Sequence, residues 1–511
     1  MIRISVSPRL PLPRLRIFAL AGAAALVATA CGDDGPGQAT AGYSGSSGGA
    51  TSAPDPDSTT DTPPGTSTDD GDTTESDTTD GNTTDTGPGG SSVCDAEPPL
   101  APPLPGGLRL QSEFGDPELL QVRTRGMWAI WWDPAFDHED DAQWLFDRLD
   151  DVRCRAINDL DMADPPNPGN GVFYNVYIHH GDQDGFPNGW GNGQGTDGFG
   201  NPFLTLPNGA HLDEGNVNHE GFHVFQYSSD SPGFAYAGDS QWYVESTAQW
   251  YSAWRQPLGL LTFVEAGAID GNPHLSLWHS FSNEAPGDPT DWMFQVRQYG
   301  MHTYLFYLTE YAGMDRDIIT SGFYGGITVS PQQYHYDSVG ADQHRSNFAD
   351  WAAHNTADFD YLTPEQVERA RQEVVAVGDP DNIHPYVAEY VDVGTAGQWL
   401  RPPPELSPRG WAYNVVRIDN TQAATYTLSL DGDPTGSEGD PSHFEGRVVV
   451  MTPAGAAYTD LTMSDPLQGE ATVMVEAVEA ADAEVFLVVA SVAEHFGGNQ
   501  TYGYQYRIDR R

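Results

Sequence analysis

The composition of residues 32–93 predicts that the folded part of this chain begins after position 93. They are almost entirely Gly, Ser, Thr, Asp and Pro, with 12 acidic residues and no Arg. Such a composition cannot bury enough apolar surface to offset the conformational entropy lost on folding. We therefore predict a disordered acidic stalk over residues 31–93 and expect folded domains only from residue 94 onward.

An apolar run lies ahead of the stalk. Residues 17–30 follow four Arg within the first 16 residues and form a run too short to span a bilayer, which is typical of a signal peptide. The run ends in small residues followed by Cys31, which resembles the lipobox of bacterial lipoproteins, although Ala28 stands where Leu is usual. The resemblance implies a signal peptide at residues 1–30 and a lipid on the Cys31 thiol. An ordinary secretory signal with an unrelated Cys is the alternative.

The chain is strongly acidic and contains no Lys. It has 73 Asp and Glu against 23 basic residues, all of them Arg, and its formal net charge is −50. A surface this negative repels phosphate backbones, so we expect no nucleic-acid partner and no polybasic contact with a membrane. The absence of Lys also excludes Schiff-base enzymes and P-loops, because both need its ammonium group.

The first folded segment combines strand and helix patterns. Residues 125–133 and 172–178 read as strands, and residues 140–160 have apolar side chains at helical spacing. From residue 216 to about residue 374 the pattern is mostly helical. These patterns predict a domain over residues 94–385 with a small twisted sheet and a mostly helical second half.

The hydrophobic period changes to two after three consecutive prolines at residues 402–404. We predict strands at residues 413–418, 425–430, 447–451, 472–478, 484–492 and 502–508. Several short strands at this spacing indicate a β-sandwich over residues 400–511. The predicted fold class is therefore α+β, with the all-β part at the C-terminus.

The strongest chemical motif is H-E-x-x-H, formed by His219, Glu220 and His223. On a helix, residues four apart lie one turn apart on the same side, so both imidazoles can reach one metal ion. Glu220 stands beside the pair, where it can address water at the metal. Gln226 and Ser229 occupy the positions of the metzincin Gly and His, which excludes that branch.

A third ligand is needed for a catalytic zinc site. Glu245 lies 22 residues beyond His223 in a helical segment, W-x-x-E-x-x-A. With these motifs, residues 120–375 resemble a gluzincin-type, zincin-like metallopeptidase domain. The resemblance implies one Zn²⁺ bound by His219, His223 and Glu245, with Glu220 as the general base.

The resemblance implies two further features. Zincin domains have an antiparallel edge strand along the cleft, and residues 203–206 are the candidate here. The thermolysin-like subfamily has an Asp four residues after the Glu ligand, where this chain has Gln249. A carboxylate that orients a ligand imidazole would then come from elsewhere, with Asp239 and Asp213 as candidates.

The oxyanion of the reaction needs a donor other than Lys. Tyr299 and His302 share one face of a predicted helix, and we favour Tyr299 over His302. An aromatic stripe that belongs only to the core is the alternative for both residues.

The remaining motifs concern stability. Cys94 and Cys154 are left after Cys31, and an exported chain with one such pair predicts a disulfide, with two free thiols as the alternative. Residues 182–185, D-Q-D-G, are similar to a calcium loop but lack the EF-hand spacing. A solvated turn is favoured there, and irregular Ca²⁺ binding is the alternative.

Together these features predict a lipid-anchored zinc endopeptidase of the cell envelope, at the outer membrane or cell surface, acting on protein or peptide substrates. A surface adhesion or carbohydrate-binding lipoprotein with a non-catalytic zinc site is the first alternative. A metal-dependent hydrolase of a non-peptide amide is the second.

Overall fold

A computed structural model describes residues 108, 119–165, 173–180, 193–196, 202–257, 269, 271–279, 297–357, 359–368, 387–392, 397–419, 421–476 and 482–511. The chain divides into two units, one of which is residues 34–95. The predictions for the signal peptide, the stalk, Cys31, Cys94 and residues 182–185 lie outside the described residues. No helix in the described ranges is long and apolar enough to cross a membrane.

The described chain mixes helices and strands, which confirms the α+β class. The helices of the described residues are α2 (Glu139–Asn158), η3 (Ala210–Leu212), α4 (Glu214–Gln226), η4 (Pro232–Phe234), η5 (Gly238–Ser240), α5 (Gln241–Arg255), α8 (His302–Phe306), η6 (Tyr307–Tyr311), α9 (Asp317–Thr320), η7 (Ser321–Phe323), α10 (Pro331–Val339), α11 (Ala341–Thr356) and η9 (Pro404–Leu406). The first sheet contains β1 (Gln121–Arg125), β2 (Trp128–Trp132), β3 (Tyr174–His179), β4 (Gly193–Thr196) and β5 (Pro202–Pro207). The helix predicted at residues 140–160 is confirmed by α2.

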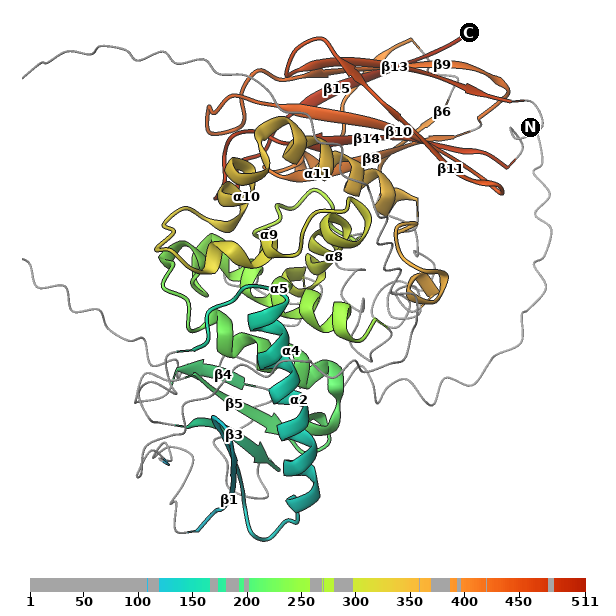
Figure 1. Ribbon diagram of the computed structural model, residues 1–511. Helices are drawn as coiled ribbons and strands as arrows, with labels where there is room; N and C mark the ends of the chain where they lie inside the picture. Colours follow the sequence, from blue (N-terminus) through green and yellow to red (C-terminus); the bar gives the residue numbers. More distant parts are fainter. Residues whose placement is uncertain are drawn as a thin grey trace, which may run out of the picture. The chain divides into compact units, whose positions relative to one another are not determined.

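The first sheet has the strand order β1-β2-β3-β5-β4, with β2, β3 and β5 parallel and both edge strands antiparallel. Alternate side chains separate its two faces. Trp128 and Ile130 enter the main core, while Ala129 and Trp131 join a smaller cluster on the opposite face. Figure 1 shows α2 beside this sheet, and its Leu145, Leu149 and Val152 belong to the main core. α2 in turn contacts α4, the helix that carries the H-E-x-x-H motif.

The predicted edge strand at residues 203–206 is wrong in its position. β5 covers these residues, but it lies between β3 and β4 and pairs with both. The edge is β4, whose sequence Gly-Gln-Gly-Thr has no apolar side chain. Backbone pairing forms this strand without an apolar alternation, so the sequence pattern did not show it.

Two five-stranded sheets form the C-terminal part. Their strands are β6 (Val387–Asp392), β7 (Trp399–Leu400), β8 (Ala412–Asp419), β9 (Ala424–Gly432), β10 (Phe444–Thr452), β11 (Gly455–Asp460), β12 (Thr462–Met463), β13 (Gln468–Val475), β14 (Glu484–Ser491) and β15 (Tyr504–Arg510). One sheet has the order β11-β10-β14-β8-β6 and the other β12-β13-β9-β15-β7. All six predicted strands are present, and both sheets contribute to one apolar cluster.

The first of these two sheets also contacts the helices. Val449 of β10 and Val488 of β14 belong to the same core cluster as Trp351 of α11. Arg447 of β10 is almost fully buried and its Nε lies 2.6 Å from Asp350 Oδ1 of α11. The C-terminal sheet and the helices therefore share a packed contact.

Candidate metal centre

Helix α4 places its polar side chains in the protein interior. Asp213 caps it, because the Asp213 Oδ1 atom accepts a hydrogen bond from the Asn216 backbone N–H at 2.8 Å. Every residue from 215 to 226 is buried. A Cβ atom on Gly221 would lie 3.2 Å from Leu149 Cδ2, so glycine allows α4 to pack closely against α2. Buried polar groups are costly unless they find partners, so those on α4 need an explanation.

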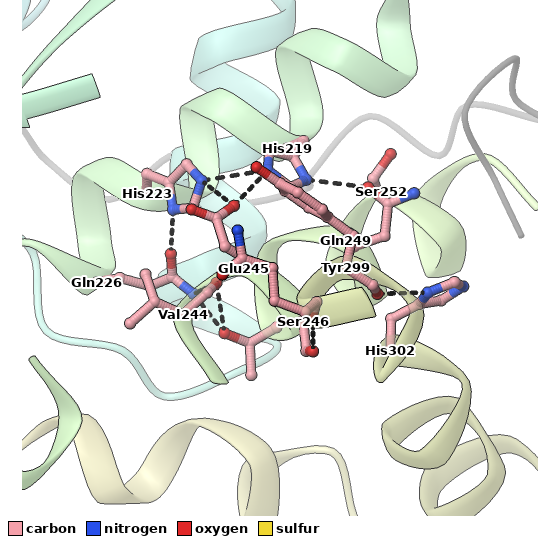
Figure 2. Close-up of polar contacts among 12 residues, drawn as sticks. His219, His223, Gln226, Val244, Glu245, Ser246, Gln249, Ser252, Tyr299 and His302 are labelled. Atoms are coloured by element: carbon pink, nitrogen blue, oxygen red, sulfur yellow. Dashed lines mark hydrogen bonds and ion pairs between the residues drawn. The ribbon is translucent and has the colours of Figure 1, made fainter. Parts of the chain in front are cut away.

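Three of the buried side chains converge on one point. His219 and His223 extend from α4, and Glu245 extends from α5 (Figure 2). The Nε2 atoms of the two histidines are 3.2 Å apart, and Glu245 Oε2 lies 3.3 Å from His219 Nε2 and 3.5 Å from His223 Nε2. We call these residues the metal-site triad.

The spacing of the triad fits a bound ion. A tetrahedral zinc with ligands at about 2.0–2.2 Å separates neighbouring ligand atoms by roughly 3.3–3.6 Å. The three separations, 3.2, 3.3 and 3.5 Å, lie at or close to this range. The triad could therefore hold a metal ion without a large rearrangement.

A glutamine fixes the ring of His223. The His223 Nδ1 atom lies 2.6 Å from Gln226 Oε1, and the Gln226 amide nitrogen donates to the Val244 carbonyl oxygen at 2.9 Å and to the Thr247 hydroxyl. Thr247 donates its own proton to the Tyr243 carbonyl oxygen at 2.7 Å. Because the amide nitrogen is engaged there, Gln226 presents its carbonyl oxygen to the imidazole. His223 then carries its proton on Nδ1 and leaves Nε2 free to bind a metal.

A second glutamine serves His219. The His219 Nδ1 atom lies 3.0 Å from Gln249 Oε1, so the residue that replaces the expected Asp takes over its position beside the ring. The two carboxylate candidates are wrong. Asp213 caps α4, and Asp239 accepts a hydrogen bond from the Gly498 backbone N–H. Uncharged amides therefore orient both imidazoles.

Glu220 is buried beside the triad. Its Oε2 atom has no hydrogen-bond partner among the described residues. Burial raises the pKa of Glu220 to about 8, with a further increase from Glu245 and an opposing effect from His219. Burial also acts to raise the pKa of Glu245, but the charge and hydrogen bonds of His223 and His219 outweigh it and lower that pKa to about 2. Glu245 is therefore an anion beside the two histidines. Glu220 has a carboxyl oxygen without a hydrogen-bond partner among the described residues.

Tyr299 lies against the triad and His302 does not. The ring centroids of Tyr299 and His219 are 5.9 Å apart, and Figure 2 shows the phenol ring pointing toward the triad. The His302 ring points away from the triad, and its Nδ1 atom donates to the Tyr299 carbonyl oxygen at 2.9 Å. Burial lowers the pKa of His302 to about 4, which keeps that imidazole neutral at pH 7. The arrangement supports the preference for Tyr299.

The structure brings together His219, Glu220, His223, Glu245 and Tyr299. Sequence reasoning missed Gln226 and Gln249, although a signal existed: they follow His223 by three residues and Glu245 by four. At these spacings Gln226 and Gln249 lie beside the candidate ligands His223 and Glu245 on the same helices.

The structure describes one of the two cysteines of the predicted disulfide. Cys154 is buried in α2 and is disulfide-bonded. Its partner lies outside the described residues, so the pairing with Cys94 stays a prediction.

Comparisons with known proteins give no family for this chain. No protein-family model matches it, and no curated protein does. Among solved structures it is similar to a family GH115 4-O-methyl-alpha-glucuronidase with specificity for decorated arabinogalactans, at 10% identity and a TM-score of 0.14. The match covers 42% of this chain and 30% of that protein. A likeness this slight indicates neither the fold nor the function of this chain.

Proposed function

We propose that this protein is a zinc-dependent endopeptidase of the gluzincin type. The observation that carries the proposal is the convergence of His219, His223 and Glu245 at the separations of a tetrahedral metal site. Two imidazoles and one carboxylate are a ligand set of catalytic zinc, which keeps a fourth position open for water or substrate. The amide partners at both Nδ1 atoms support it, because they leave the Nε2 lone pairs for the ion.

A zinc ion in this position would act as a Lewis acid and lower the pKa of water toward about 7. Glu220 must be ionised to act as a base, and a zinc ion beside it would lower the pKa that burial raises to about 8. Glu220 would then receive a proton from the attacking water and deliver it to the leaving nitrogen of the scissile bond. Its Oε2 atom suits this role, since it is buried beside the ligands and is engaged by no other described side chain. The buried setting also keeps bulk water from competing for that proton.

Tyr299 stabilises the negative charge that develops on the substrate carbonyl oxygen. Its ring points toward the triad, where a phenol O–H can donate a hydrogen bond without the lysine this chain lacks. One such donor is worth about 10²–10³ in kcat.

The fold of this region is, under the same proposal, zincin-like, and β4 supplies the substrate-binding edge. β4 is antiparallel, lies at the end of the first sheet and packs against α4. A peptide in extended form can pair with such an edge through its backbone. The two C-terminal sheets form, on this view, a β-sandwich that braces the peptidase domain through α11.

The protein is, in this proposal, anchored in the cell envelope by a lipid on Cys31 and acts on protein or peptide at the outer membrane or cell surface. Changing Cys31 to Ser should move the protein from the membrane fraction to the soluble fraction. Unchanged membrane attachment would contradict the anchor without touching the peptidase assignment.

The decisive experiment compares the full chain with its Glu220→Gln variant. The wild type should cleave casein or a peptide library and lose this activity with a chelator, regaining it with zinc. Glu220→Gln should keep its zinc and lose about 10²–10⁴ of the rate, because only the proton transfer is removed. Wild-type protein that holds zinc but cleaves no protein or peptide would overturn the proposal and favour the adhesion alternative.

A further inference from the structure

A second group of metal-ligating side chains lies at the carboxyl ends of the parallel strands. His138 is the N-cap residue of α2, the helix that follows β2, and Asp141 lies in the first turn of that helix. His180 directly follows β3, and His211 lies in η3, just beyond β5. β2, β3 and β5 are neighbours and run parallel. Ligand sites in open α/β sheets gather at this end of the strands, so the topology itself assembles the group.

Three of these side chains converge closely. Asp141 Oδ2 lies 2.6 Å from His138 Nδ1 and 3.1 Å from His211 Nε2. One potential ligand atom from each of the three side chains lies within 4.8 Å of the other two. Both histidines are buried, while the Asp141 side chain is 26% exposed and gives access from solvent. We call His138, Asp141 and His211 the strand-end cluster.

Each histidine of the cluster has a partner for its other ring nitrogen. His138 Nε2 lies 2.9 Å from His180 Nε2, and the His180 ring is stacked on Phe136. His211 Nδ1 lies 3.4 Å from the Pro207 carbonyl oxygen, which can accept its proton when Nε2 binds a metal. The Gly209 N–H, which donates to the same nitrogen at 3.1 Å, would then lose that bond. Such outer contacts fix the ring orientation of histidine ligands.

The geometry points to a second divalent transition-metal site formed by His138, Asp141 and His211, separate from the metal-site triad. Two imidazoles and a carboxylate suit zinc or a similar ion. The ion would join the start of α2 to η3, and η3 is followed directly by Asp213, the N-cap of α4. Its role is therefore to hold the helix that presents His219 and His223, and it takes no part in hydrolysis.

The test counts zinc bound per chain by elemental analysis of the dialysed full-length protein. The wild type should hold about two zinc ions, and His219→Ala with Glu245→Ala about one, left in the strand-end cluster. His211→Ala and Asp141→Asn should each leave roughly one ion, which remains in the triad. His354→Ala is the matched control, because this buried His also pairs with an Asp (Asp360, 2.5 Å) and should change no stoichiometry.

Cobalt binding covers the case in which a cluster variant fails to fold. In the His219→Ala, Glu245→Ala background the cluster is intact, and Co²⁺ should give visible d–d absorption that saturates at about one ion per chain. Absence of this absorption would overturn the proposal and leave a purely hydrogen-bonded network. Wild-type zinc content of about one, lost entirely with the triad variant, would overturn it as well. Neither result bears on peptidase activity, so the proposed function is tested separately.

Discussion

Replacing Gln226 by Leu should weaken zinc binding without removing a ligand. In the zinc-bound protein His223 uses Nε2 for the ion, so its Nδ1–H depends on the Gln226 carbonyl oxygen 2.6 Å away. His223 is fully buried, and no water would replace that acceptor. Without zinc the proton can move to Nε2, which lies 3.5 Å from Glu245 Oε2. Replacing Gln226 therefore destabilises the zinc-bound state more than the zinc-free state.

The size of the effect follows from the cost of an unsatisfied buried donor. That cost is about 1–3 kcal/mol, which corresponds to a roughly 5–150-fold increase in the zinc Kd. Removing the hydrogen-bond partner of a histidine ligand typically weakens metal binding by about 10–100-fold, which lies within the same range.

The assay is a competition titration against a chromophoric chelator at fixed pH. The matched control is Gln500→Leu, which removes another buried glutamine whose amide bonds Asp440 and Tyr502 in the C-terminal part. The control should lose stability and keep its zinc Kd. A Gln226→Leu protein that is folded and binds zinc within about twofold of wild type would refute the reasoning.

Three further predictions address catalysis, packing and pH. Tyr299→Phe should lower kcat by about 10²–10³ at unchanged zinc content, as measured by steady-state kinetics; an unchanged kcat would remove Tyr299 from the mechanism. Arg447→Met should lower the free energy of unfolding in urea by about 1–3 kcal/mol, because the buried guanidinium pairs with the partly exposed Asp350, whereas the exposed Arg401→Met should cost under about 1 kcal/mol. Burial lowers the pKa of His335 from 6.5 to about 4. The contribution of the neutral His335 to the free energy of unfolding is therefore complete above pH 6.5 and is lost as the pH falls through about 4. His335→Gln should therefore show a shallower loss of stability over that interval, and an unchanged slope would contradict this cause.

The candidate ligand residues were predictable because their signal is local. Helical spacing alone places His219 and His223 on one side of α4, and Glu245 lies on the next long helix. The C-terminal strands were predictable for the same reason, since their side chains alternate as in β13. Short-range patterns of this kind do not depend on how distant segments meet.

The features that sequence reasoning missed depend on distant segments or on polar groups. β4 has no apolar alternation, and β6 lies ahead of the proline run that marked the change of period. The strand-end cluster joins Asp141 to His211, 70 positions further along the chain, and the parallel order of β2, β3 and β5 brings them together. Gln249 was read as a lost carboxylate, because the sequence does not show that an amide oxygen performs the same orientation.

The most direct measurement of the central claim is an anomalous difference map, recorded at the zinc absorption edge from crystals of the zinc-loaded protein. We predict a peak at about 2.0–2.2 Å from His219 Nε2, His223 Nε2 and a carboxylate oxygen of Glu245. Zinc-loaded crystals that show no peak among these three atoms would contradict the metal centre, and with it the proposed peptidase.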